Sequence, residues 1–312
     1  MVKVLTSAKA LPPFVQSLVD EREKARASKN FPLSDNLRKQ IEDMGYILHD
    51  NKEGVKVMKE GDYDKEPDKH FLILFGSGEI APSSVEIYRQ TFLKIGKKDI
   101  RIALITTPAG FQPNVELVYG EIRDFLLASL PDFNLTIDIV FANTKDDAND
   151  DELVGELDKA DVVFLGPGSP TYAVKQLENS LLYGKIIERV KNRTTLILAS
   201  AATITFSRYA LPIYEIYKVG EDLHWVDGLD IYQEIWEDKT IIPHFNNAEG
   251  GAGLDTSYCY IGKSRAEKLL SMLPTATPVL GIDEHTALVI DLESGEQLVR
   301  GKGAVHNLVD VV

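Results

Sequence analysis

Ser200 lies where a predicted strand meets a predicted helix, with small residues on both sides of it. Residues 194–199 read Thr-Thr-Leu-Ile-Leu-Ala, a run typical of a fully buried strand. Such a corner is the setting of a nucleophile elbow, in which only small neighbours fit and the serine hydroxyl projects from the end of the sheet. The amide of Ala201 would then point at a developing oxyanion. A packing corner of small residues is the alternative, because alanines stand where an elbow normally carries glycines.

A histidine and a carboxylate lie at the ends of two further predicted strands. Of the six histidines, only His244 ends a buried strand (240–244) in this part of the chain and enters a loop of small polar residues. Glu284 follows the predicted strand 278–282. The carboxyl ends of parallel strands gather at one edge of a sheet. We therefore expect Ser200, His244 and Glu284 to form a triad, with His244 as base and Glu284 fixing its tautomer.

Two glycine-rich turns also follow predicted strands. In Gly166-Pro167-Gly168-Ser169 the proline has no N–H, so the amides of Gly168 and Ser169 are available to a ligand, unless this is an ordinary turn. Residues 76–81 fit a dinucleotide fingerprint. However, Glu79 would stand beside the pyrophosphate, and the next strand ends without an acid for the ribose. We expect a tight turn there and no cofactor.

The remaining candidates for chemistry are weak. No two histidines have the spacing of metal ligands on a helix, so no metal is expected. Cys259 lacks small neighbours and is predicted to be a packed thiol, and as the single cysteine it excludes a disulfide within the chain.

The elements that position these residues alternate between strand and helix from residue 70 onward. This rhythm predicts an α/β fold of three layers with a largely parallel sheet covered on both faces. Strands are predicted at 71–75, 101–106, 135–141, 161–165, 194–199, 240–244 and 278–282, and helices at 83–95, 115–129, 171–178 and 183–191. Residues 286–309 predict a hairpin and a last strand.

A small helical and hairpin domain is predicted before this rhythm begins. Its two helices are expected within 11–29 and from an N-cap at Ser34 to Gly45, followed by a hairpin over 46–57. We expect three segments: a module at 1–60, a charged linker at 61–69 and the α/β domain at 70–312. Residues 1–69 carry 13 basic and 13 acidic side chains, so the formal net charge of −14 arises after residue 69.

The N-terminal module resembles the small C-terminal helical module of cysteinyl-tRNA synthetases. In that family the module lies near the tRNA anticodon end, but the neutral charge here favours a structural or interaction role over tRNA binding. The residues that carry the resemblance are Glu21-Arg22, Ala25-Arg26, Lys29, Ser34-Asp35, Arg38, Ile41, Gly45 and the turn Asp50 to Gly54.

Residues 70–290 resemble the dipeptidase E and cyanophycinase family of serine peptidases, whose fold is that of class I glutamine amidotransferases. The matching motifs are Gly166 to Ser169, Ser200-Ala201-Ala202, His244-Phe245 and Gly281 to Leu288. The resemblance implies that Ser200 is the nucleophile, His244 the base and Glu284 its orienter, with the amides of Gly168 and Ala201 as oxyanion donors. The implied function is a serine hydrolase of peptide or amide bonds. A catalytically silent binding module of the same fold, associated with tRNA or a synthetase, is the alternative.

The substrate pocket is expected to include Ser169, Asn246, Asn247 and Glu249. Residues 246–255 contain no basic side chain, and Arg208 is the first basic residue after Ser200 in sequence. Without a fixed cation, the pocket is predicted to take a small peptide or amide that is neutral or basic near the scissile bond.

Composition limits the partners and the location. No apolar run reaches the roughly 18 residues of a membrane span, and the first residues lack a signal peptide pattern, so we expect a cytoplasmic protein. The acidic α/β part repels phosphate backbones, and nucleic acid is therefore not an expected partner.

Overall fold

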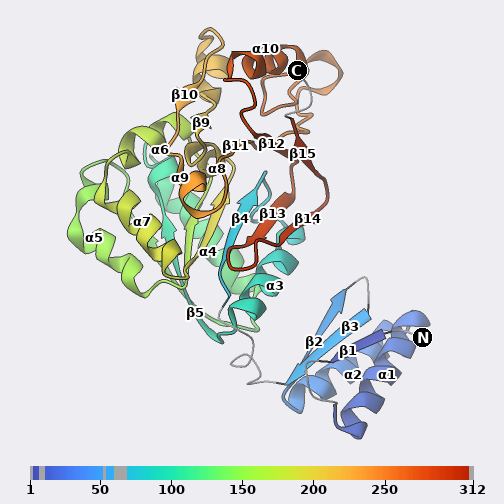
Figure 1. The fold of residues 1–312 in the computed structure, drawn as a ribbon. Helices are drawn as coiled ribbons and strands as arrows, with labels where there is room; N and C mark the ends of the chain where they lie inside the picture. The colour runs from blue at the N-terminus through green and yellow to red at the C-terminus, as the bar shows by residue number, and fades with distance from the viewer. Residues whose placement is uncertain (1–2, 7–10, 52–53, 60–68, 309–312) are drawn as a thin grey trace. The chain divides into compact units, whose positions relative to one another are not determined.

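The computed structural model describes residues 3–6, 11–51, 54–59 and 69–308 (Figure 1). The chain separates into two compact units, Met1–Glu66 and Pro67–Val312, called below the N-terminal and the C-terminal unit. The linker predicted at 61–69 lies outside the described residues, except for Lys69.

The N-terminal unit packs two helices on a three-stranded sheet. The sheet has the order β1-β3-β2, in which β1 is parallel and β2 antiparallel to β3. Apolar side chains from both helices and the two longer strands form its core, with Val19, Ile41 and Val55 fully buried. The elements are β1 (Lys3–Thr6), α1 (Pro13–Ala27), α2 (Phe31–Asp43), β2 (Tyr46–Asn51) and β3 (Gly54–Lys59).

The start of α2 differs from the prediction. The N-cap is Asn30, whose side chain accepts a hydrogen bond from the amide of Leu33 at 3.3 Å, and Ser34 lies inside the helix. Pro32 lies in the first turn of α2, where the residues need no N–H to form the helix, so a proline fits there. The predicted end is confirmed: Gly45 follows the last helical turn with a φ of 76°.

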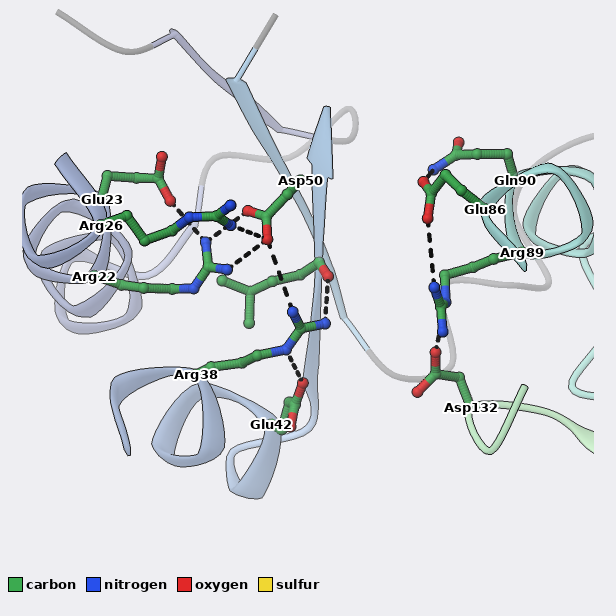
Figure 2. A network of polar contacts seen from close by, with 11 residues as sticks. Arg22, Glu23, Arg26, Arg38, Glu42, Asp50, Glu86, Arg89, Gln90 and Asp132 are labelled. Carbon is green, nitrogen blue, oxygen red and sulfur yellow. Dashed lines mark hydrogen bonds and ion pairs between the residues drawn. The ribbon is translucent and has the colours of Figure 1, made fainter. Parts of the chain in front are cut away.

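One carboxylate joins the helices of this unit to its hairpin. Asp50 on β2 accepts two hydrogen bonds from the guanidinium of Arg22 on α1, at 2.7 and 2.6 Å (Figure 2). Arg26 on α1 also pairs with Asp50, and Arg38 on α2 lies 3.8 Å from the same carboxylate. Burial raises the pKa of Asp50, but the hydrogen bonds and charges of Arg22 and Arg26 outweigh it, so that its pKa is lowered. This network of ion pairs adds to the small apolar core in joining the helices to the hairpin.

We propose that the two units are independent domains, and a substitution of Asp50 tests this. Asp50→Asn takes from the buried Arg22 the carboxylate that accepts two of its hydrogen bonds, leaving it only the pair with Glu23, and should cost the N-terminal unit about 2–3 kcal/mol of unfolding free energy. Hydrogen exchange followed by mass spectrometry should show faster exchange in β2 and β3 and unchanged exchange in the C-terminal unit. The control Asp43→Asn removes an exposed carboxylate and should alter exchange in neither unit. Faster exchange throughout the chain would contradict the proposal.

The C-terminal unit is built on a seven-stranded sheet of order β14-β13-β4-β8-β7-β5-β6. The five strands from β4 to β6 in this order are parallel. Beside β4 the sheet continues with β13, which is antiparallel to β4, and then with β14, which is antiparallel to β13 (both red in Figure 1). Every residue of β4, β7 and β8 is buried, so both faces of the central sheet are covered. The strands are β4 (Phe71–Phe75), β5 (Asp99–Ile105), β6 (Asn134–Val140), β7 (Val162–Leu165), β8 (Thr195–Ala199), β13 (Thr286–Asp291) and β14 (Gln297–Gly301).

The helices of this unit follow the predicted alternation. The longest, α4 (Val115–Ser129), has the predicted bounds, and α3 (Val85–Ile95) begins after a short 3₁₀ turn. The others are α5 (Asp151–Gly155), α6 (Pro170–Leu177), α7 (Leu181–Lys191), α8 (Ala201–Thr205), α9 (Ile231–Ile235) and α10 (Lys263–Met272), with a π-helical turn at Glu215–Val219.

A second sheet holds the strands that precede His244 and Glu284. Its order is β11-β12-β15, with β11 (Thr240–Ile242) parallel and β15 (Val305–Asn307) antiparallel to β12 (Val279–Ile282). The predicted strands 240–244 and 278–282 therefore form a separate small sheet instead of extending the main one. Residues 283–285 join this sheet to β13 of the main sheet. A further pair, β9 (Tyr209–Ala210) and β10 (Val226–Asp227), lies between α8 and α9 in the chain.

Candidate active site

Ser200 occupies the corner between β8 and α8 in a strained conformation. Its φ of 51° and ψ of −113° lie outside the regions that residues other than glycine favour, which costs about 1–3 kcal/mol. The corner is held by a hydrogen bond from the Ser200 amide to the carbonyl of Phe75 at 3.1 Å and by one from Thr203 Oγ1 to the Ser200 carbonyl at 2.7 Å. Ala201 and Ala202 are buried beside it. These alanines fit a corner of this shape without flanking glycines.

His244 is held in place by backbone hydrogen bonds. Its own φ is 48°, its amide donates to the carbonyl of Gly76 at 3.1 Å, and its carbonyl accepts from the amide of Cys259 at 3.2 Å. Cys259 is the middle of three consecutive residues, Tyr258 to Tyr260, with φ values of 54°, 57° and 66°. This left-handed turn places the Tyr260 ring 5.7 Å from the imidazole. The loop therefore fixes both the backbone and the ring of His244.

Two hydrogen bonds join the predicted triad residues. Ser200 Oγ lies 2.8 Å from His244 Nε2, and His244 Nδ1 lies 2.8 Å from Glu284 Oε1. The hydrogen bond from His244 is the main cause that lowers the pKa of Glu284, against the opposing effect of burial. An ionised carboxylate only accepts, so Nδ1 carries the proton and the lone pair of Nε2 faces the serine hydroxyl. This tautomer allows the imidazole to take the hydroxyl proton.

Asn246 and Asn247, which we expected to line the substrate pocket, instead hold Glu284. Asn247 is buried and donates its amide hydrogen to Glu284 Oε1 at 2.9 Å, and Asn246 Oδ1 accepts from the Glu284 backbone amide at 2.8 Å. The side chains of this loop thus orient the carboxylate that in turn orients the imidazole. Their neutral polar character was the available signal, but the sequence did not show which group they face.

The two expected oxyanion donors lie beside the serine. Gly168 and Ala201 both line the same pocket as Ser200. A Cβ at Gly168 would overlap the carbonyl of Pro108, so only glycine allows this close approach. Ala201 is the first residue of α8, where backbone N–H groups have no partner within the helix. The Ser169 amide, in contrast, is occupied by the carbonyl of Pro108 at 2.8 Å.

The active-site pocket has a volume of about 370 Å³. Glu249 lies in its lining as predicted, whereas Ser169 does not, because its hydroxyl caps α6 by accepting from the Tyr172 amide at 3.3 Å. The lining consists of Gly168, Pro170, Ser200, Ala201, Ile204, Ile213, Tyr214, Tyr217, Lys218, His244, Glu249, Cys259 and Tyr260.

The pocket contains a cation that the sequence did not reveal. Lys218, in the π-helical turn, belongs to the lining, with its ammonium 4.8 Å from the Tyr217 ring centroid. Arg208, the candidate suggested by proximity in sequence, is not in the lining and pairs with Asp238 at 2.6 Å. The premise that no cation reaches the pocket is therefore wrong. Only the folded path of the chain from α8 to the π turn places Lys218 there.

Two other ionisable groups near this site are buried. Burial raises the pKa of the Cys259 thiol to about 12, so the thiol beside the pocket is neither a thiolate nor a nucleophile at neutral pH. Burial likewise raises the pKa of Glu79, in the glycine turn after β4. Its carbonyl accepts hydrogen bonds from Ser84 and Tyr88, both at 2.9 Å, so this turn is packed into the core.

The described ranges contain no cluster of three or more His, Cys, Asp and Glu side chains placed to hold a metal ion. No helix in those ranges combines the length and the apolar character that crossing a bilayer requires.

Comparisons with known proteins separate the two parts of the chain. Residues 72–298 match the model of peptidase family S51. The crystal structure of a peptidase from an acI-B1 Actinobacterium superposes with a TM-score of 0.59 at 25% identity, covering 77% of this chain and 91% of that one.

A short segment matches a different family. It is 47% identical over 49 residues to the cysteine–tRNA ligase of Methanosarcina mazei and 49% identical over 49 residues to that of Methanosarcina acetivorans. Each match spans 16% of this chain and only 10% of the relative's length. The resemblance to cysteinyl-tRNA synthetases is thus confirmed as a short, partial one.

The geometry predicts one tautomer for His244, which ¹⁵N-histidine NMR measures directly. Nδ1 should be protonated and Nε2 unprotonated in the neutral imidazole, and Glu284→Ala should shift both nitrogen resonances because Nδ1–H loses its acceptor. His224→Ala is a matched control, since the His224 ring contacts the carbonyl of Asp222 in its own loop at 2.8 Å, and it should leave the His244 signals in place. His244 signals that do not respond to Glu284→Ala would contradict the assignment.

Proposed function

Since this chain belongs to peptidase family S51, we propose that it hydrolyses a peptide or amide bond with Ser200, His244 and Glu284 as its catalytic triad. The observation that carries the proposal is the continuous hydrogen-bonded series from Ser200 Oγ through both imidazole nitrogens to Glu284, with both distances at 2.8 Å. The strained backbone at Ser200 supports it, because such strain is commonly kept where a mechanism needs it.

The reaction follows from the positions of these groups. As Ser200 Oγ attacks the substrate carbonyl carbon, its proton passes to His244 Nε2, and Glu284 stabilises the imidazolium that forms. The negative charge on the carbonyl oxygen is placed to receive hydrogen bonds from the amides of Gly168 and Ala201. His244 then gives the proton to the leaving amine, and an acyl group remains on Ser200. Water, deprotonated by His244, releases that acyl group as a carboxylic acid.

Removal of the serine hydroxyl tests the function. Ser200→Ala should lower amide hydrolysis by about a thousandfold or more and should abolish the adduct formed by a fluorophosphonate probe, measured by intact mass. The control Ser271→Ala removes an exposed hydroxyl of α10 and should change neither result. A folded wild-type protein that forms no adduct and cleaves none of a broad set of peptides and amides would favour a catalytically silent binding module.

We further propose that the pocket recognises a cationic group near the scissile bond through Glu249. Asn247 Oδ1 accepts from the backbone amide of Glu249 at 3.2 Å, which anchors the backbone of Glu249 at the edge of the pocket. Lys218 and Glu249 are both exposed, but the lysine ammonium stands on a longer and more flexible stem. The shorter Glu249 side chain loses less conformational entropy on binding than Lys218 does, and Glu249 therefore selects its partner more strongly.

Removing the charge of Glu249 and removing the charge of Lys218 should have opposite effects on the binding of basic peptides. Glu249→Gln should raise KM about tenfold for peptides with a basic residue or free amino group at that position, because one charge-assisted hydrogen bond is lost. Lys218→Met should leave these peptides unaffected or bind them more tightly. Steady-state kinetics on peptides that differ only in that charge measure both effects. A wild-type preference for acidic peptides that disappears in Lys218→Met would overturn this specificity.

A further inference from the structure

A second hollow adjoins the active-site pocket on the surface of the C-terminal unit. This groove has a volume of about 690 Å³, and its lining includes Phe111, Tyr172, Lys175, Tyr214 and Glu215. Tyr214 belongs to the lining of both hollows. The consecutive residues Gly168 and Ser169 line the pocket and the groove respectively. The groove therefore meets the pocket that contains Ser200 at Tyr214 and beside Gly168, the proposed oxyanion donor.

The groove exposes aromatic rings in a fixed arrangement. Phe111 is 47% exposed and Tyr214 is 39% exposed, so both rings have free surface that a ligand can cover. The Phe111 ring lies 5.2 Å from the Tyr172 ring at 56°, and the Tyr172 hydroxyl donates to the carbonyl of Asn143 at 2.9 Å. The Phe111 and Tyr172 rings are thus held in place before any ligand binds, so stacking on them costs little conformational entropy.

The groove also offers polar groups for a peptide backbone. Glu215 Oε1 accepts a hydrogen bond from the Thr171 hydroxyl at 2.6 Å. Its other oxygen, Oε2, is buried and accepts none from the described residues, so this carboxylate is held in place through the Thr171 hydroxyl. The ammonium of Lys175 stands on the same lining. Aromatic walls with a few polar groups are typical of a site that binds a peptide side chain and its flanking backbone.

We propose that this groove binds the part of a peptide substrate beyond the residues that flank the scissile bond, and that it selects an aromatic or large aliphatic side chain there. The preferred substrate is then a peptide of at least three residues rather than a dipeptide. This inference rests on the proposed function, because the continuity of the groove with Ser200 identifies its occupant as substrate. Phe111 and Tyr214 are its main contacts.

Two peptide series test the groove. Each starts from one cleavable dipeptide and adds a residue, Gly, Leu or Phe, at the amino end in one series and at the carboxyl end in the other. In one of the two series, the change from Gly to Phe should raise kcat/KM about tenfold through burial and ring contact. Phe111→Ala should reduce this Phe-to-Gly ratio to near one, and Phe111→Leu should restore part of it.

The matched control is Leu117→Ala, which removes an exposed apolar side chain of α4 outside both hollows and should leave the ratio unchanged. Binding of the same uncleaved peptides to Ser200→Ala, measured by calorimetry, should show the same preference without any catalysis. Equal affinities for the Gly and Phe peptides in both series would overturn the proposed role of the groove in substrate binding. Peptides that bind with this preference but are never cleaved by the wild type would instead overturn the proposed hydrolase function.

Discussion

The approach of three chain segments to the end of β4 is the constraint on which the candidate site depends. The carbonyl of Phe75 accepts from the amide of Ser200, and the carbonyl of Gly76 accepts from the amide of His244, both at 3.1 Å. The Gly76 amide donates to the carbonyl of Thr286 at 2.9 Å, two residues after Glu284. A Cβ at Gly76 would overlap the carbonyls of residues 282 and 283. The relative positions of serine, imidazole and carboxylate thus depend on one residue without a side chain.

This junction also explains a motif that resembles a nucleotide-binding turn. Glycines in such turns allow a close approach of the backbone to a phosphate, but here Gly76 allows an approach to neighbouring carbonyls and Gly78 to the His285 side chain. The carboxyl group of Glu79 is buried with a raised pKa instead of facing an anion. The same local sequence pattern therefore serves close packing between two sheets.

Much of the C-terminal unit could be predicted because its central strands β4, β7 and β8 are short, fully buried runs and strands alternate regularly with helices. The bounds of β4 and α4 agree with the prediction, and the other main strands agree within about two residues. The separation of β11 and β12 into a small sheet could not be predicted, because an aliphatic run shows that a strand is buried but not which strand it pairs with. The triad residues were identified by strand ends and by resemblance. Lys218 and the groove beside Tyr214 depend on tertiary placement and left no local signal.

The resemblance of the N-terminal unit to a synthetase module has a structural explanation. Arg22, Arg26 and Arg38 are among the residues that carry it, and all three pair with Asp50 within the unit (Figure 2). Arginines that are neutralised in this way, one of them buried, contribute little to an electrostatic surface for a phosphate backbone. Residues that carry the similarity therefore form the ion pairs that join the two helices to the hairpin.

The buried thiol of Cys259 determines which kinds of chemical probe suit this protein. Because burial raises its pKa to about 12, the single cysteine of the chain is a thiol and not a thiolate at pH 7. Alkylating reagents and mild oxidants that act through thiolates therefore have almost no target beside the pocket, and the protein needs no reducing agent to keep this position intact. An electrophile that enters the pocket meets a serine hydroxyl in contact with an imidazole, and covalent labelling can be interpreted without competition from sulfur.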